Sequence, residues 1–116
     1  SARVRAELHR LVKALAQSDF AQAASLVRSS DPPWSAERLQ AELAPFLAAH
    51  GRVLFTPPAR QPTFTVLDKT GEHLYRVRQV LLDDVDDNDW FLEGTVDLTV
   101  RQANDEPLVE LLAIRS

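Results

Sequence analysis

The sequence contains no cysteine, no methionine and only three glycines. A chain without cysteine can form neither a disulfide framework nor a thiolate zinc site, and this absence favours a reducing compartment. Gly51, Gly71 and Gly94 are too far apart to form a glycine-rich phosphate-binding loop. No apolar run approaches the roughly 20 residues of a membrane span, and no signal-peptide pattern is present. We therefore expect a cytoplasmic protein with no membrane partner.

The size and charge of the chain indicate one soluble domain. It has 116 residues, of which 45% are hydrophobic, and its net charge is −4. Strong nonspecific binding to nucleic acid depends on clustered lysine and arginine, so a negative net charge argues against it. Because the first residue is not methionine, we interpret residues 1–116 as a single domain cut from a longer protein, with processing of a small protein as the alternative.

Apolar residues recur at helical spacing in the first half of the chain. Asp19 and Ser35 are suitable N-caps, and Gly51 is the usual residue after a helix C-terminus. Trp34 and Leu39 lie on either side of Ser35 at the spacing of a hydrophobic staple. These signals predict three helices, over residues 2–17, 20–27 and 36–49.

The second half of the chain has the period of two that is typical of strands. The alternation is clearest over residues 90–100, and Gly94 in the middle marks the expected site of a bulge or bend. Helices followed by strands indicate an α+β fold, with three helices packed on a curved, mainly antiparallel sheet of four to five strands. Further strands are predicted over residues 52–56, 63–67, 74–82 and 108–114, with a turn over residues 102–107.

The acidic stretch of residues 83–89 imitates the start of a calcium-binding loop. The imitation ends at Asp89, where the loop needs glycine, and at Thr95, where it needs a bidentate glutamate. We interpret the stretch as a solvated hairpin turn in which Asp and Asn side chains bond their own backbone. No pair of histidines has metal-ligand spacing and no nucleophile elbow is present. The sequence therefore predicts no metal and no cofactor, and it leaves open whether the protein is an enzyme.

One face of the predicted sheet is the candidate binding site. Gln79 is the odd member of its apolar face, because a buried amide needs partners, and Tyr75 and Trp90 could flank it in a pocket. Phe46 of the third helix and Arg60 of the proline-rich loop complete the set of ligand- or partner-binding candidates. On the opposite face, the sequence leaves a choice between cross-strand arginine–carboxylate pairs and a ligand site.

The order of the expected elements resembles a known fold. A helix, then Ser18-Asp19-Phe20 and a second helix, then a third helix and a curved meander together resemble the NTF2-like, cone-shaped α+β fold. Members of that fold include enzymes, ligand binders and interaction modules, so this resemblance does not fix a function.

A second resemblance rests on short segments within residues 8–114. They are Trp34-Ser-Ala-Glu-Arg-Leu, Leu43-Ala-Pro-Phe-Leu, Pro58-Ala-Arg60, Arg78-Gln79-Val-Leu, Asp87-Asn-Asp-Trp90 and Val96-Asp97-Leu98. Together they are similar to the C-terminal, uncharacterised domain of a bacterial family of DEAD/DEAH-box helicases. This implies an intracellular parent protein that couples ATP hydrolysis to nucleic-acid remodelling. The motor's Walker-type residues are not in this chain, so no helicase catalytic residue is carried over.

Two functions remain in competition at this point. The first is a noncatalytic accessory domain of an ATP-dependent DEAD/DEAH-box helicase, which contacts the remainder of the parent or another protein and meets nucleic acid through that parent. The alternative is a free-standing NTF2-like protein that binds a small ligand, as a binder or an enzyme. A deep, polar-floored cavity lined by Phe46, Tyr75, Gln79 and Trp90 favours the alternative, and a filled core favours the accessory domain. The oligomeric state is left open.

Overall fold

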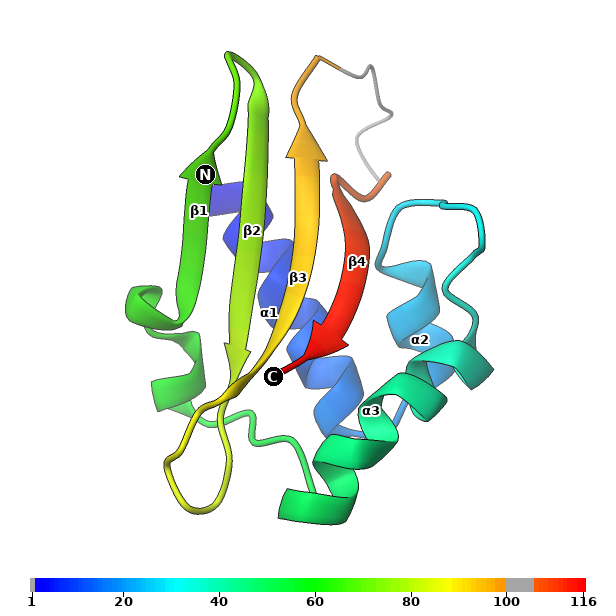
Figure 1. Ribbon diagram of the computed structural model, residues 1–116, viewed down its shortest axis with the longest axis vertical. Helices are drawn as coiled ribbons and strands as arrows, with labels where there is room; N and C mark the ends of the chain where they lie inside the picture. Colours follow the sequence, from blue (N-terminus) through cyan, green and yellow to red (C-terminus); the bar gives the residue numbers. More distant parts are fainter. Residues whose placement is uncertain (1, 100–105) are drawn as a thin grey trace.

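The computed structural model describes residues 2–99 and 106–116. In this part of the chain, three helices precede four strands, and two short 3-10 turns join the two groups (Figure 1). The elements are α1 (Ala2–Ala16), α2 (Phe20–Ser25), α3 (Ala36–His50), η1 (Pro57–Arg60), η2 (Pro62–Phe64), β1 (Thr65–Lys69), β2 (Leu74–Leu81), β3 (Trp90–Asp97) and β4 (Val109–Arg115). The α+β class predicted from the sequence is therefore confirmed.

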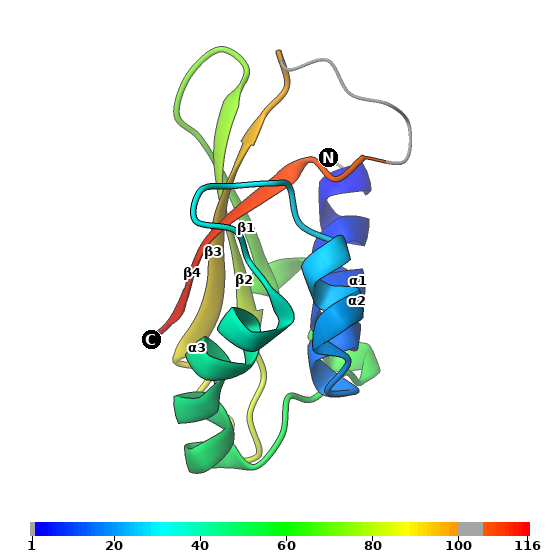
Figure 2. The same ribbon diagram turned by 90° about the vertical axis from the view of Figure 1, so that its right-hand side faces the viewer.

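The strands form a single open sheet in the order β1-β2-β3-β4, and each strand is antiparallel to its neighbour. Figure 2 shows α1 and α2 on the same face of this sheet, while α3 packs at the side of β4. Among the described residues, no helix covers the opposite face. The fold therefore has one sheet face inside the core and one outside it.

The first helix buries the predicted apolar stripe and one charged residue. Glu7 lies in this stripe and is only 6% exposed. Its Oε1 accepts the backbone N–H of Leu108 at 2.7 Å and that of Val109 at 3.4 Å, and Arg3 Nε donates to Oε2 at 3.3 Å. These bonds tie α1 to the start of β4. The buried apolar members of the stripe are Val4, Leu8, Leu11, Val12 and Leu15.

The predicted starts of α2 and α3 and the end of α3 at Gly51 are confirmed, whereas α2 ends at Ser25, two residues earlier than predicted. The Asp19 side chain accepts the backbone N–H of Gln22 at 3.1 Å. Ser35 Oγ accepts the backbone N–H of Arg38 at the same distance, 3.1 Å. Gly51 ends α3 with a φ of 82°, a left-handed conformation that glycine adopts without strain. Local capping chemistry therefore sets these boundaries.

The strand predicted over residues 52–56 is wrong. This segment has no regular secondary structure and leads directly into the 3-10 turn that starts at Pro57. Val53 is buried and Phe55 partly buried in the core beside the helices, so this short apolar run reflects packing and not pairing with a strand. The sheet consequently has four strands in the described part of the chain, the lower of the two predicted numbers.

The remaining strands are present with shifted ends. β1 starts and ends two residues later than predicted, because residues 62–64 form η2, and β4 is displaced by one residue. β3 ends at Asp97, whose Oδ1 accepts the backbone N–H of Thr99 at 2.9 Å and turns the chain out of the sheet. The predicted strand end at residue 100, and most of the predicted turn over 102–107, lie outside the described residues.

The expected irregularity at Gly94 is confirmed. The pairing of β3 with β4 shifts register between Glu93 and Gly94. Glu93 pairs with Ala113 and Gly94 pairs with Leu111, so Leu112 is one extra residue on β4. An extra residue of this kind is a β-bulge, which bends the strand and increases its twist.

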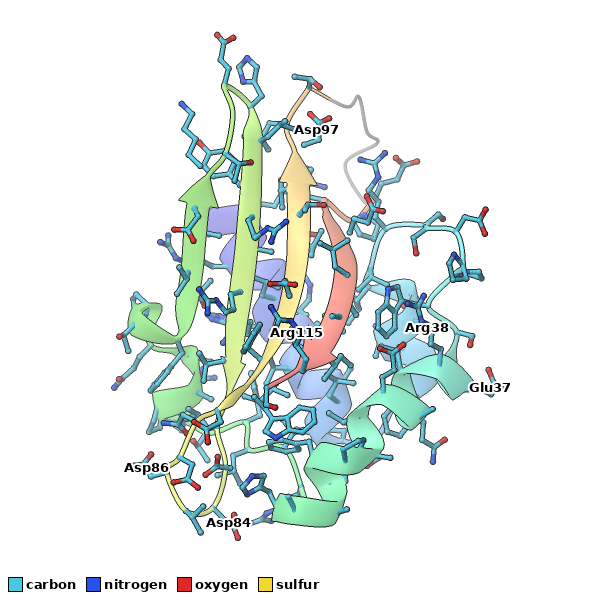
Figure 3. All side chains as sticks on the ribbon, in the orientation of Figure 1. Glu37, Arg38, Asp84, Asp86, Asp97 and Arg115 are labelled. Carbon is cyan, nitrogen blue, oxygen red and sulfur yellow. The ribbon has the colours of Figure 1, made fainter. Side chains whose placement is uncertain are left out.

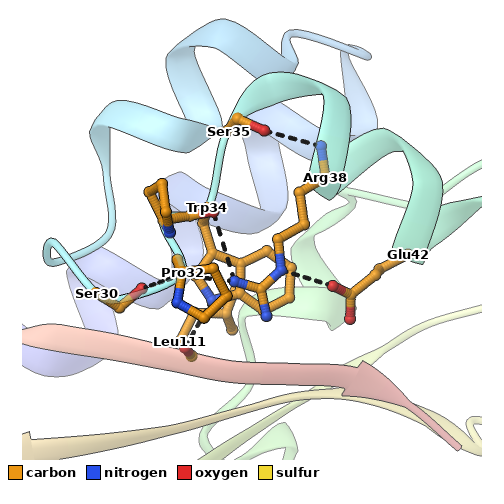
Figure 4. Close-up of polar contacts among 8 residues, drawn as sticks. Ser30, Pro32, Trp34, Ser35, Arg38, Glu42 and Leu111 are labelled. Carbon is orange, nitrogen blue, oxygen red and sulfur yellow. Dashed lines mark hydrogen bonds and ion pairs between the residues drawn. The ribbon is translucent and has the colours of Figure 1, made fainter.

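Trp34 joins the loop before α3 to the last strand (Figure 4). Its side chain is 5% exposed, and its Nε1–H donates to the carbonyl of Leu111 at 2.7 Å. The Arg38 guanidinium lies 3.7 Å from the centre of the indole ring, and its Nε donates to Glu42 at 2.8 Å. A second Arg38 nitrogen donates to the carbonyl of Pro32 at 2.9 Å. Trp34 thus links the loop before α3, the first turn of α3 and β4.

The segment between α2 and α3 follows the outer edge of β4. The backbone N–H of Arg28 donates to the carbonyl of Val109 at 2.8 Å, and Trp34 supplies the donor for Leu111. Because β4 is the terminal strand on this side of the sheet, both carbonyls receive partners from another element.

Candidate functional site

Two of the predicted site residues are part of the filled core. Phe46 and Gln79 are both 0% exposed. Gln79 Oε1 accepts a hydrogen bond of 2.5 Å from Thr65 Oγ1, and Gln79 Nε2 donates to the carbonyl of Val80 at 3.3 Å. The buried amide therefore has partners within the protein, which explains how it is accommodated on an apolar face.

The aromatic candidates lie at opposite ends of the sheet. Trp90 contacts Phe46 edge to face, with 6.0 Å between ring centres. Tyr75 pairs with Val96, whereas Trp90 pairs with Leu81, six residues further along β2. At about 3.3 Å per residue, this places Tyr75 and Trp90 about 20 Å apart along the strand. The structure brings Trp90 to Phe46 but does not bring Tyr75 to either of them.

Tyr75 instead borders a small apolar hollow near the start of α1. Its volume is about 70 Å³, far below the roughly 300–1,000 Å³ of pockets that hold small organic ligands. Its lining is almost entirely aliphatic, so no polar floor is available to orient a substrate. The other residues that line it are Val4, Leu67, Val77, Val96 and Leu98.

The acidic loop is organised around one buried carboxylate. Asp83 Oδ1 accepts the backbone N–H groups of Val85 and Asp87 at 3.1 and 3.0 Å, and Oδ2 accepts that of Asn88 at 2.9 Å. This is the backbone bonding that the sequence predicted for a hairpin turn, although the residue that provides it was not singled out. Asp83 therefore holds the whole loop in one conformation.

His50 joins this loop to the end of α3. Its Nδ1 lies 3.1 Å from Asp84 Oδ1, and its Nε2 lies 3.8 Å from Asp83 Oδ2. The three residues place potential metal-ligand atoms within 4.8 Å of one another, so they are the described residues that could hold a cation. Because both Asp83 oxygens already accept backbone N–H groups, the arrangement is explained as a tether between the loop and the helix.

We expect the ionisation of Asp83 to make the free energy of unfolding depend on pH. Burial opposes ionisation of its carboxyl, but the three backbone N–H donors and His50 together lower its pKa below the ordinary value. A pKa lowered by folding stabilises the protein above the unfolded pKa of about 3.9, and this contribution disappears as pH falls through the folded pKa. Urea unfolding should be measured from pH 7 to pH 3. The free energy of unfolding should decrease once the pH is lower than about 4.

Asp83→Asn should weaken the three bonds and lower the free energy of unfolding by about 1–3 kcal/mol at pH 7. The difference between wild type and this variant should then shrink as the pH approaches 3. Asp87→Asn is the matched control, because it makes the same charge change at an exposed side chain of the same loop. Equal effects of the two substitutions at pH 7 would contradict this assignment.

The outer face of the sheet carries exposed arginines around an aromatic ring. We define the open face by three rows of residues that lie side by side across the strands, away from α1 and α2. Its three arginines are exposed, and Figure 3 shows Arg115 in front of the sheet, on the side facing the viewer. The rows are Asp68, Arg76, Thr95 and Glu110; Val66, Arg78, Glu93 and Ala113; and Val80, Phe91 and Arg115.

Phe91 lies between two guanidinium groups on the open face. Arg78 and Arg115 lie 5.1 and 4.9 Å from the centre of its ring. Arg115 also donates to Glu93 at 3.2 Å. Within the described residues, Arg76 and Arg78 make no ion pair, so the cross-strand carboxylate pairs considered for them are not formed. The open face thus combines an aromatic ring with arginines that keep unused hydrogen-bond donors.

Fold and surface together define a small α+β domain with one sheet face in its core and an arginine- and aromatic-bearing face outside. The chain belongs to the family described as "Domain of unknown function (DUF3516)", whose model matches residues 1–114. No curated protein and no solved structure matches the chain. In the described ranges, none of the helices is long and apolar enough to cross a membrane.

Proposed function

We propose that the chain is a noncatalytic accessory domain of an ATP-dependent DEAD/DEAH-box helicase and that it docks on the motor part of that protein through the open face. The observation that carries this proposal is Phe91 held between Arg78 and Arg115 on an uncovered sheet face. Aromatic residues and arginine are enriched in the energetically dominant centres of protein interfaces. The segments similar to the helicase family supply the identity of the parent, and such a parent would work in the cytoplasm.

The charges of the open face favour a protein partner with surface carboxylates. Arg76 and Arg78 are exposed and lack an ion pair within the described residues, so both can bind carboxylates across an interface. Nucleic acid is a poorer partner for this surface, because Asp68, Glu93 and Glu110 lie in the same rows and repel phosphate. Nucleic acid is then reached only through the motor.

The packed interior supports the accessory role over the ligand-binding alternative. Phe46 and Gln79, which would line the ligand cavity, have no exposed surface, and the amide of Gln79 is bonded internally. We also propose that the architecture is NTF2-like. Three helices, an antiparallel meander and the bulge at Gly94 support that assignment, with the cone filled by side chains.

The first test of this proposal is the reading frame upstream of Ser1, which should encode helicase motifs. The motor and this domain can then be produced separately and their association measured by calorimetry. Replacing both Phe91 and Arg78 by alanine should weaken binding at least tenfold, because this removes the centre of the interface. Lys13→Ala is the control, since Lys13 is exposed on α1, away from the open face. An initiator methionine just before Ser1, or unchanged binding by the double variant, would refute the proposal.

A further inference from the structure

Three basic residues of α1 and η1 lie close enough for their charges to interact, away from the open face. We call Arg5, His9 and Arg60 the basic cluster. Arg5 and His9 are four residues apart on α1 and therefore lie on the same side of the helix. Arg60 ends η1, and the two 3-10 turns lie beside α1 in both Figure 1 and Figure 2. Arg60 is exposed, and its guanidinium lies 5.5 Å from the centre of the Phe55 ring.

The basic cluster contains buried polar atoms that the protein does not satisfy. Arg5 Nε and His9 Nε2 are both inaccessible to solvent and have no hydrogen-bond partner. Such orphaned groups are rare in folded proteins, and each calls for an explanation. Arg3 on the same helix shows the ordinary solution, because it pairs with Glu7 at 3.3 Å.

No carboxylate of the described residues forms an ion pair with any member of the basic cluster. Burial lowers the pKa of His9, and the positive charges of Arg60 and Arg5 lower it further. These effects agree with three groups that face one another and repel. An anion bound beside these groups would remove the repulsion.

We infer that the basic cluster binds a single phosphate group, either free or at the end of a small organic molecule. Two guanidinium groups offer forked donors that match the oxygens of a tetrahedral oxyanion, and the imidazole adds a third donor. Long nucleic acids fit less well, because their binding needs many cations and this chain has a net charge of −4. This site is independent of the proposed helicase role, and either can fail without the other.

The test is an amide NMR titration of the whole chain at constant ionic strength, with inorganic phosphate and a nucleoside 5′-monophosphate as probes. We expect saturable shifts around His9 and Arg60 with both probes and none with the nucleoside that lacks phosphate. The pKa of His9, followed through its ring signals, should rise when phosphate is bound. That change separates phosphate binding from a general salt effect, which chloride at the same ionic strength would reproduce.

Arg60→Gln should weaken phosphate binding at least tenfold, and because Arg60 is exposed this variant should fold normally. Arg5→Gln should have the same effect. Arg10→Gln is the matched control, since Arg10 is an exposed arginine on the same helix outside the cluster. The inference is overturned if Arg10→Gln weakens binding equally, or if chloride causes the same shifts. It is also overturned if single-stranded oligonucleotides bind with an affinity that grows with length and is insensitive to Arg60→Gln.

Discussion

Gly94→Ala should lower the free energy of unfolding by about 2–3 kcal/mol, a large effect for one added methyl group. A Cβ at this position would lie 2.7 Å from the backbone oxygen of Glu110 and 3.1 Å from Val109 Cγ1. The first of these atoms belongs to the backbone of β4 and cannot move without disturbing the sheet. The cost therefore arises because β3 and β4 approach each other closely at the bulge, and not because Gly94 has an unusual backbone conformation.

Urea denaturation of the variant and of Gly71→Ala would measure this effect directly. Gly71 makes a matched control, because the atoms nearest to a Cβ there belong to the side chain of Leu74, at 3.3 Å and beyond, and not to the backbone of a neighbouring strand. We expect Gly71→Ala to change the free energy of unfolding by less than about 0.5 kcal/mol. Similar losses for the two variants would show that the close approach of the strands is not the reason why glycine occupies position 94.

Trp34→Ala should be the most destabilising single truncation in the α2–α3 loop, with a loss of about 3–5 kcal/mol. The indole is buried, and its removal leaves a cavity beside Leu39 and Leu111 in the main core. It also removes the donor to the Leu111 carbonyl and the surface on which Arg38 stacks. Packing, hydrogen bonding and stacking are lost together.

Two further substitutions separate these contributions. Trp34→Phe keeps most of the apolar contact but leaves the Leu111 carbonyl without its donor, so it should cost about 1–3 kcal/mol. Arg38→Gln removes the stack on the indole together with the bonds to Glu42 and Pro32, and it should cost about 1 kcal/mol. Guanidinium chloride unfolding curves would rank the three variants. If Trp34→Phe were as damaging as Trp34→Ala, the hydrogen bond rather than the packing would dominate.

Local signals in the sequence were sufficient for the helices and for the bulge. The caps at Asp19 and Ser35 act over three residues, and Gly94 interrupts an otherwise regular strand. The segment 52–56 could not be assigned in the same way, because a short apolar run shows only that side chains are suited to burial. Whether such a segment becomes a strand depends on a neighbouring strand that the local sequence does not reveal.

The candidate site could be predicted only in part, because it depends on contacts between residues that are far apart in the sequence. Alternation placed Tyr75, Gln79 and Trp90 on one face, but only the strand register shows that Tyr75 and Trp90 lie at opposite ends of it. The partner of Gln79 is Thr65, a hydroxyl contributed by a different strand. Glu7 and Asp83 were missed as organising residues, although a glutamate within an apolar helical stripe is a readable signal. The backbone partners of Glu7 are set by tertiary structure, whereas those of Asp83 lie within its own loop.

The hydrogen bonds at the outer edge of β4 limit where a further strand can be added to this sheet. Exposed sheet edges are templates for strand addition, which underlies both peptide recognition and aggregation. At the β4 edge, the carbonyls of Val109 and Leu111 are already occupied, so an incoming strand would have to displace Arg28 and Trp34. The other edge is β1, a five-residue strand. Strand exchange or intermolecular sheet formation by this domain is therefore directed to β1, where the short edge limits the number of backbone bonds that a guest strand can form.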